Sequence, residues 1–401
     1  MRPDLAAALR SVAGGRGTPA YVTDGGALAA ACADMRAAFP DPIVRQYSVK
    51  ANDTPAVIRE VSARGFGANV VSRGEWAAAR RAGVPNARVS LEGVGKTAAD
   101  LHAAVRAARD GEPLLWVALE SADEALALRR SAERAGVRVD VLYRLNPDVS
   151  PETLPVLAVG TGVSKFGMDE TEIAHAIEAG GGPGGPLRPR GIHLHVGSQL
   201  GAVDAWRDAA RKALALAALW RGSIGTFDTV DLGGGFPVAP EGEPAPRPER
   251  FARELPALLE AIPAERRPTR LAVEPGRALV ARAGWLVARV LHARQRAGSQ
   301  VIIDAGMTEL IRPAMYGARH RVMALTSLGR PVHDGAGIPA DTPTRVEGPI
   351  CETTDSFGLH DLPPLRRGDL VAIADAGAYA ASQRSRYNGR PAVPHILIRA
   401  D

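Results

Sequence analysis

Lys50 has the most distinctive chemistry of any residue in this chain. It is one of only four lysines among 401 residues, and almost all the positive charge is otherwise arginine. An arginine can supply charge, but only a lysine amine can form a Schiff base with a carbonyl compound. A lysine held among apolar residues is costly unless its charge is used or removed. We therefore interpret Lys50 as a nucleophile.

Two glycine-containing turns would complete a site for a phosphorylated ring compound. The triple glycine at 233–235 follows an apolar run, where backbone N–H groups can close around a phosphate. Glu274-Pro-Gly-Arg277 places an acid and a base on one tight turn, which suits a ring nitrogen and a phosphate. Taken alone, most glycine clusters are simple turns, and such an acid–base pair is often a local ion pair on a loop.

A histidine pair lies on the apolar run Gly191–Val196. Alternation along a strand places His193 and His195 on the same face. A histidine on an apolar strand is more often a core residue. We expect this face to point inward, into a site, because Gly197 and Ser198 extend it.

The elements that would position these residues alternate along the first 280 residues. Short apolar runs are followed by amphipathic helical stretches, which is typical of parallel strands with crossover connections. Eight such units predict an α/β fold, a (β/α)8 TIM-type barrel, whose functional residues gather at the carboxyl ends of strands. The four groups above lie at such ends. A doubly wound sheet is the alternative, but no long excursion reverses the strand order. The expected strands are 43–49, 68–71, 88–91, 114–119, 139–145, 191–196, 229–232 and 270–273.

The pattern changes after about residue 280 to β-like runs without long helices between them. This predicts a C-terminal antiparallel β domain, which the N-terminal run 18–23 is expected to join. We therefore expect a barrel over 25–280, and a β domain built from 1–24 and 281–401. The expected strands of the β domain are 280–293, 299–304, 320–326, 343–348, 369–374 and 395–398.

Composition argues against several other classes of protein. The net charge is +5, but no run of five or six like charges appears, so we expect no nucleic-acid partner. No stretch of 18 apolar residues exists, so we expect no membrane span. Two distant cysteines, Cys32 and Cys351, make neither a disulfide framework nor a zinc site. We expect no metal site and a cytoplasmic location.

Several motifs occurring together in one order resemble a known family over nearly the whole chain. They are similar to those of the alanine-racemase-like, fold-type III decarboxylases that depend on pyridoxal 5′-phosphate (PLP) and act on diaminopimelate, ornithine or arginine. The diaminopimelate decarboxylase branch is the most similar, chiefly because of Arg312-Pro-Ala-Met-Tyr316. The other motifs are Lys50-Ala-Asn, Ser164-Lys-Phe-Gly167, His193-x-His-x-Gly-Ser-Gln199, the triple glycine, Glu274-Pro-Gly-Arg277, Cys351-Glu-Thr-Thr-Asp355, Gly377-Ala-Tyr379 and Tyr387-Asn388.

The resemblance implies a role for each candidate residue. Lys50 would carry PLP as an internal aldimine, His195 would stack on the pyridine face, and Glu274 would keep the ring nitrogen protonated. Cys351 would return a proton to the substrate Cα, reaching in from the partner subunit of a homodimer with shared active sites. The phosphate would be surrounded by Ser198, Gly234, Gly235, Gly276, Arg277 and Tyr387. The substrate would be held by Arg277, Arg312, Tyr316, Glu352, Asp355 and Tyr387.

The resemblance further implies decarboxylation of an amino-acid substrate, with meso-diaminopimelate, giving lysine, as the leading candidate. Departures from the family pattern, such as Asn69, Arg319 and Thr353-Thr354, keep a specialised biosynthetic decarboxylase with another substrate, free or carrier-bound, as an alternative. A racemase would share the cofactor and the barrel, but Cys351 with Glu352 and Asp355 favours decarboxylation. An inactive regulatory homologue is the non-enzyme alternative, and a protein without PLP would be colourless.

Overall fold

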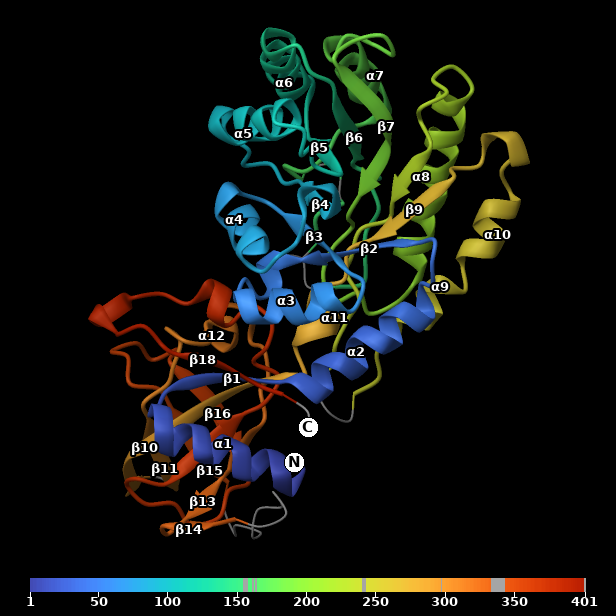
Figure 1. Cartoon of the computed structure of the whole chain (residues 1–401). Helices are drawn as coiled ribbons and strands as arrows, with labels where there is room; N and C mark the ends of the chain where they lie inside the picture. Colours follow the sequence, from blue (N-terminus) through green and yellow to red (C-terminus); the bar gives the residue numbers. More distant parts are fainter. Residues whose placement is uncertain are drawn as a thin grey trace. The chain divides into compact units, whose positions relative to one another are not determined.

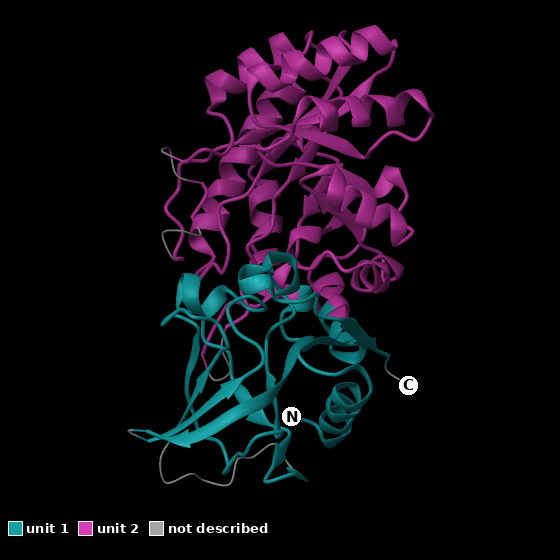
Figure 2. Ribbon diagram, turned by 90° about the vertical axis from the view of Figure 1, so that its left-hand side faces the viewer, with its two compact units in different colours: residues 1–31, 279–401 teal, residues 32–278 magenta. Residues whose placement is uncertain are grey.

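The computed structural model describes residues 1–153, 158–160, 162, 164–239, 243–296, 298–332 and 343–399 (Figure 1). The chain divides into two compact units (Figure 2). Cys32–Ala278 forms one unit, which we call the barrel unit. Met1–Ala31 and Leu279–Asp401 together form the other, which we call the β unit.

The barrel unit is built on eight strands that close into a barrel in sequence order, each parallel to its neighbours. This confirms the fold class predicted from the alternation of strands and helices. The strands are β2 (Val44–Ser48), β3 (Gly67–Val70), β4 (Val89–Leu91), β5 (Trp116–Leu119), β6 (Val139–Leu145), β7 (Leu187–Leu194), β8 (Thr229–Asp231) and β9 (Arg270–Val273).

Side-chain caps fix where several of the intervening helices begin. Ser72 and Ser121 each accept a hydrogen bond from a backbone N–H in the first helical turn, and Thr97 and Asp169 form reciprocal capping boxes. These caps set each helix at a defined distance from the preceding strand. The helices are α2 (Gly25–Ala38), which crosses the unit boundary, α3 (Pro55–Ala63), α4 (Arg73–Arg81), α5 (Ala98–Arg109), α6 (Ala122–Ala135), α7 (Glu170–Ala179), α8 (Asp204–Arg221), α9 (Pro248–Ala252), α10 (Leu255–Glu260) and α11 (Arg277–Val280); short 3-10 helices span Asn86–Arg88 and Ala264–Arg266.

Strand β7 begins earlier than the sequence predicts, at Leu187 instead of Gly191. Its pairing with β6 shifts register between Val141 and Leu142, whose partners are Pro189 and Gly191, so that Arg190 is left out of the ladder. A proline cannot donate a ladder hydrogen bond, and a bulge is one of the few places in a sheet where it is tolerated. The bulge therefore explains how the strand passes through a proline.

The interior of the barrel changes from apolar to polar along its axis. Buried Trp116, Ala118, Leu142 and Ala272 pack together, with Val44 beside them. Residues two positions further along these strands point to the same side because side chains alternate. That rule carries Glu274 and Arg144 to the carboxyl end of the barrel interior, where both are buried.

The β unit is an eight-stranded, mostly antiparallel sheet. β1 belongs to this sheet, as expected for the N-terminal run. It pairs antiparallel with β10 and parallel with β18, and β11 and β15 form the other parallel pair. The strands are β1 (Ala20–Asp24), β10 (Gly284–Gln295), β11 (Ser299–Ile303), β12 (Val322–Ala324), β15 (Thr344–Glu347), β16 (Ser356–His360), β17 (Leu370–Ile373) and β18 (His395–Ile398); β13 (Thr326–Ser327) and β14 (Arg330–Pro331) form a separate hairpin.

The α-helices of the β unit were not predicted. Helix α1 (Pro3–Arg16) buries Leu5, Leu9 and Ala13 against the sheet residues Val22 and Val287. Its apolar residues recur at helical spacing, but the helix precedes the first strand and lay outside the expected alternation. Helix α12 (Arg312–Tyr316) is a single turn within a motif, and short 3-10 helices span Ala381–Gln383 and Tyr387–Gly389.

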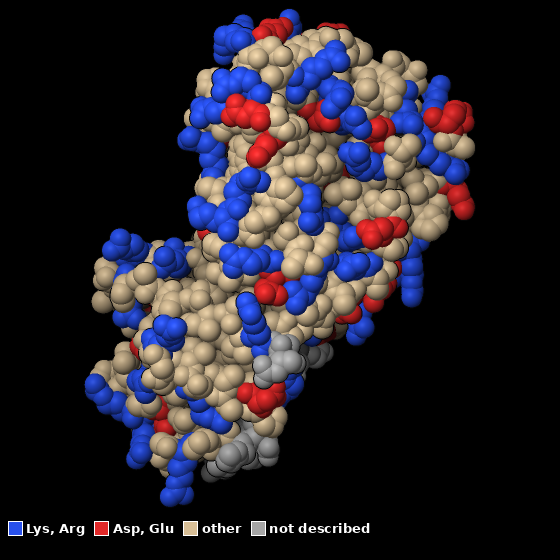
Figure 3. All heavy atoms as spheres, viewed as in Figure 1, with Lys and Arg blue, Asp and Glu red and all other residues tan. Residues whose placement is uncertain are grey.

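Charge on the surface is dispersed. Lysine and arginine side chains are scattered over the face shown in Figure 3, with acidic side chains between them on both units. No helix in the described part of the chain is long and apolar enough to cross a membrane.

Candidate active site

Lys50 follows β2 directly, in the short 3-10 helix η1 (Val49–Ala51). Ser48, just before it, is buried and ties β2 to the end of β9: its N–H donates to Pro275 O (3.1 Å) and its Oγ to Glu274 O (3.2 Å). The charge of Lys50 acts on His195, where it adds to burial in lowering the histidine pKa. Lys50 and Glu274 are therefore held at the same end of the barrel.

The glycine turns form a close-packed cradle beside Ser198 and Arg277. Gly233 and Gly235 have φ of +66° and +100°, which other residues rarely adopt, and a Cβ on Gly235 would approach Gly197 O to 2.7 Å. Arg277 Nη2 donates to Ser198 Oγ at 3.1 Å. The predicted phosphate-binding residues of the barrel unit thus converge, with the guanidinium and the hydroxyl already in contact.

His195 lies against this glycine turn. Its Nδ1 accepts a hydrogen bond from Gly234 N–H (3.2 Å), which leaves Nε2 to carry the ring proton. Burial, followed by the charge of Lys50, lowers the pKa of His195 well below its usual range. A neutral imidazole is consistent with stacking on an aromatic ring.

Glu274 belongs to a buried polar cluster that was only partly predicted. His193 Nε2 lies 3.3 Å from Glu274 Oε1 and 3.4 Å from Glu92 Oε2. The carboxyl group of Glu92 accepts from Asn69 Nδ2 at 2.6 Å. Asp231, on β8, is fully buried and its Oδ1 accepts from Gly233 N–H (3.0 Å). Glu92 and Asp231 were not among the predicted site residues.

A buried ion pair lies at the ends of the neighbouring strands. Arg144 Nη1 contacts Glu120 Oε1 at 2.6 Å, and its guanidinium stacks 4.7 Å from the centre of the Phe166 ring. Gly167 N–H donates to the other Glu120 oxygen at 2.8 Å. The Ser164-Lys-Phe-Gly167 motif therefore orders the polar end of the barrel around Arg144.

The β unit carries the predicted substrate-binding residue Arg312 in an unusual setting. The guanidinium is buried and lies 5.3 Å from the Tyr316 ring centre and 5.7 Å from that of Tyr379. Burial lowers the pKa of Arg312. Arg312 makes no ion pair with an acidic residue anywhere in the described ranges. Tyr379 had no predicted role beyond its motif, yet it completes this aromatic setting.

The segment after β15 holds the predicted acid Cys351 and its neighbours. Cys351 is a free, exposed thiol. The next residue, Glu352, accepts a hydrogen bond at Oε1 from Tyr387 Oη (2.8 Å). Asp355 is buried instead, and accepts backbone hydrogen bonds from Met307 (2.5 Å) and Ile350 (2.7 Å). The structure therefore places Asp355 as the residue that shapes this loop.

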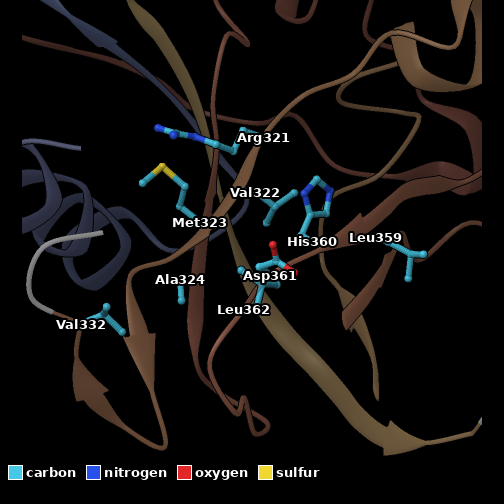
Figure 4. Close-up of a pocket in the computed structure, with 9 residues that line it drawn as sticks. All are labelled: Arg321, Val322, Met323, Ala324, Val332, Leu359, His360, Asp361 and Leu362. Atoms are coloured by element: carbon cyan, nitrogen blue, oxygen red, sulfur yellow. The ribbon is translucent and has the colours of Figure 1, made fainter. Parts of the chain in front are cut away.

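The β unit contains a cavity away from the predicted site residues. A cavity of about 270 Å³ in the β unit lies between β12 and the segment that follows β16 (Figure 4). Its charged lining residues are Arg321 and Asp361, and His360 lines it as well. None of the predicted site residues lines this cavity.

Comparisons with known proteins agree with this geometry. The family model described as pyridoxal-dependent decarboxylase, pyridoxal binding domain, matches residues 26–281. The chain therefore belongs to the pyridoxal-dependent decarboxylases, and it is a PLP-dependent enzyme with a carboxy-lyase activity.

The relatives narrow the similarity to one branch. The chain is 34% identical over 399 residues to the diaminopimelate decarboxylase of Aquifex aeolicus, covering 97% of this chain and 89% of that protein. It is 34% identical over 387 residues to that of Archaeoglobus fulgidus, covering 96% and 88%. The crystal structure of Helicobacter pylori diaminopimelate decarboxylase complexed with L-lysine has a TM-score of 0.84 and 29% identity, covering 95% of this chain and 92% of that one.

The barrel residues fit the cofactor of this family. Glu274 Oε1 is buried without a hydrogen-bond partner among the described residues, as a carboxylate reserved for a ring nitrogen would be. A Cβ on Gly234 would collide with Glu274 O, so only glycine allows the backbone to run this close to the site. Arg277 and Ser198 offer charge and a hydroxyl for a phosphate.

Proposed function

We propose that this enzyme removes the α-carboxylate of meso-diaminopimelate and so produces lysine. The curated relatives carry the name diaminopimelate decarboxylase, and one structural neighbour binds L-lysine. The observation that favours a substrate with a distal carboxylate is the buried Arg312. Its guanidinium lies between two tyrosine rings and has no acidic partner in the part of the chain that the structure describes. A buried cation in such a setting is stabilised by an anionic ligand.

The same proposal assigns the barrel residues to the cofactor. Lys50 carries PLP covalently, His195 stacks on its ring, and Glu274 faces its ring nitrogen. PLP, when bound, supplies the electron sink for the electron pair that stays on the substrate Cα when CO2 leaves. The phosphate is held by Ser198, Gly234, Gly235, Gly276 and Arg277, with Tyr387.

The β-unit residues act on the substrate. Arg312 and Tyr316 hold the distal carboxylate, Glu352 holds the distal amine, and the Cys351 thiol donates a proton to Cα. Asp355 acts on this chemistry by holding the backbone of the loop that carries Cys351 and Glu352, since its carboxyl group is already engaged by two N–H groups.

A CO2-release screen tests the substrate. The purified enzyme with PLP is given meso-diaminopimelate, lysine, ornithine, arginine and glutamate in turn. We expect the highest kcat/KM with meso-diaminopimelate, because a guanidinium fork binds a carboxylate and repels the terminal amine of ornithine or lysine. A preference for ornithine or lysine would contradict the proposal and would favour a specialised decarboxylase.

We also propose that the enzyme works as a homodimer with shared active sites, and that it does so in the cytoplasm, where an exposed thiol stays reduced. Support comes from the family resemblance and from the division of the predicted residues between the two units. Inactive Lys50→Ala and Cys351→Ala subunits should regain part of the activity when mixed, since some mixed dimers hold one intact site. Absence of recovery after demonstrated subunit exchange would contradict shared sites.

A further inference from the structure

The buried cluster around His193 contains more carboxyl groups than the proposed cofactor chemistry needs. Glu92, Asp231 and Glu274 come from the ends of β4, β8 and β9, and all three are at most 4% exposed. One atom each of Glu92, His193 and Glu274 lies within 4.8 Å of the others. Ionised Glu92 and Glu274 at this spacing would repel each other strongly in a medium of low dielectric constant, and the charges of both act on Asp231 as well.

The surrounding groups do not neutralise three negative charges. His193 is uncharged near neutral pH, because burial lowers its pKa to about 4. Arg144 is already paired with Glu120. Lys50 is the remaining cation that acts on Glu92, and its amine is the group that would bond to the cofactor. Asn69, on β3, is neutral.

One carboxyl oxygen of each acid in the cluster has no hydrogen-bond donor among the described residues. Oε1 of Glu92, Oδ2 of Asp231 and Oε1 of Glu274 have no hydrogen-bond partner among the described residues. Ionised carboxylates only accept hydrogen bonds, whereas a protonated carboxyl group donates one. A proton on Glu92 and another on Asp231 would supply two donors without adding any residue to the cluster.

We propose that Glu92 holds a proton in the folded enzyme and acts as a positioning residue that keeps Glu274 as the single carboxylate facing the cofactor ring nitrogen. Asp231, on β8, acts as a second acid of the same kind. This inference rests on the proposed role of Glu274. The barrel then presents one negative charge to the one positive charge of a protonated ring.

The electrostatics of the cluster support this assignment. Burial raises the pKa of Glu92, and the negative charge of Glu274 raises it further. Burial followed by the charges of Glu274 and Glu92 raises the pKa of Asp231 well above its usual range. His193 and Lys50 oppose the shift of Glu92 without reversing it.

Thermal unfolding of the full chain across pH 5 to 8 tests the proposal without using activity. Glu92→Gln keeps the shape and neutrality of a protonated Glu92 but cannot titrate, and Glu133→Gln on exposed α6 is the control. Because the folded-state pKa of Glu92 is raised, the unfolded chain loses this proton at a lower pH than the folded chain does. The Tm of the wild type should therefore fall relative to Glu92→Gln as pH rises.

The control variant and the results that would overturn the proposal give different dependences of Tm on pH. The difference between wild type and Glu133→Gln should stay constant across this range. A Tm difference for Glu92→Gln that stays constant, or that shrinks as pH rises, would show that Glu92 is ionised and would overturn the proposal. The measurement is made with and without PLP, so an enzyme that fails to bind PLP would refute the proposed function and leave the result for Glu92 readable.

PLP binding gives a second, independent measurement. Glu92→Ala removes the donor to Glu274, and it should bind PLP about tenfold or more weakly than Glu92→Gln, the loss expected for one hydrogen bond to a charged group. The visible absorbance of bound PLP is recorded for both variants at equal occupancy. Equal affinity and equal spectra for the two variants would mean that Glu92 has no part in positioning Glu274.

Discussion

The two units contribute to the proposed site in opposite ways. In the barrel unit the site side chains are buried or half-buried, and hydrogen bonds hold their surroundings. Glu274 is 4% exposed, and the backbone around it is hydrogen-bonded to β2 and to the glycine turn. In the β unit Cys351 and Glu352 are exposed, and Tyr387 is 49% exposed. Arg312 is the exception, because it is buried between aromatic rings.

This difference matches what each unit is proposed to do. A cofactor that stays bound needs charges fixed in advance, and burial among hydrogen-bonded neighbours fixes them. A substrate that must enter and leave needs accessible groups. The barrel unit should therefore be intolerant of any change of charge, whereas the exposed residues of the β unit should tolerate small changes of hydrogen bonding.

The largest effect is expected from removing the nucleophile. Lys50→Ala should abolish activity, because the proposed covalent bond to PLP cannot form without the Lys50 amine. Borohydride reduction of the wild type followed by peptide mapping should place the pyridoxyl mass on Lys50. Lys165→Ala, at an exposed lysine, is the control, and label on Lys96, Lys165 or Lys212 would refute the assignment.

A large but smaller effect is expected at the buried cation of the β unit. Arg312→Ala should lower kcat/KM with meso-diaminopimelate by about 30-fold or more, the lower end of the cost of leaving a buried charged partner unpaired. PLP absorbance should not change, since Arg312 is proposed to hold the substrate and not the cofactor. Arg345→Ala, on β15, is the control. An equal loss of kcat/KM in both variants, or no loss in Arg312→Ala, would show that Arg312 does not bind the substrate.

The smallest effect is expected where the site is most exposed. Tyr387→Phe removes the hydroxyl that donates to Glu352, a solvent-accessible hydrogen bond, and should change kcat/KM about fivefold or less. The PLP dissociation constant is measured in parallel. A loss above about 30-fold in either quantity would show that this hydroxyl contacts a ligand group in a dry environment.

The fold was largely predictable because the barrel repeats one pattern. Eight apolar runs separated by amphipathic helices leave few alternatives, and capping residues such as Thr97 and Ser121 mark where helices begin. Departures arose where local signals conflict. Between β8 and β9, where the alternation provides for one helix, the chain forms two, α9 and α10. Strand β16 was missed because Ser356–His360 is partly exposed, contains a glycine with φ of +88° and shows no alternation of buried and exposed residues.

The predicted site residues of the barrel are brought together, but the acids around them were missed. Glu92 ends an apolar strand at the same edge as Lys50, and an acid at a barrel strand end was the available signal. Asp231 lies within the predicted strand 229–232, two residues before the glycine turn. Neither could be assigned from sequence, because proximity to Glu274 depends on strands far apart along the chain. Tyr379 was missed for the same reason, since its contact with Arg312 is non-local.

The pairing of β1 with β18 has a consequence for how the molecule is made. During synthesis β1 emerges first, then the entire barrel, and β18 comes at the far end of the described chain. The barrel has all its strands in one continuous stretch and can close while the ribosome is still producing the β unit. Until β18 appears, one edge of β1 remains open to pairing with another chain. We therefore expect the pairing of β1 with β18 to form late, after the barrel strands have been made.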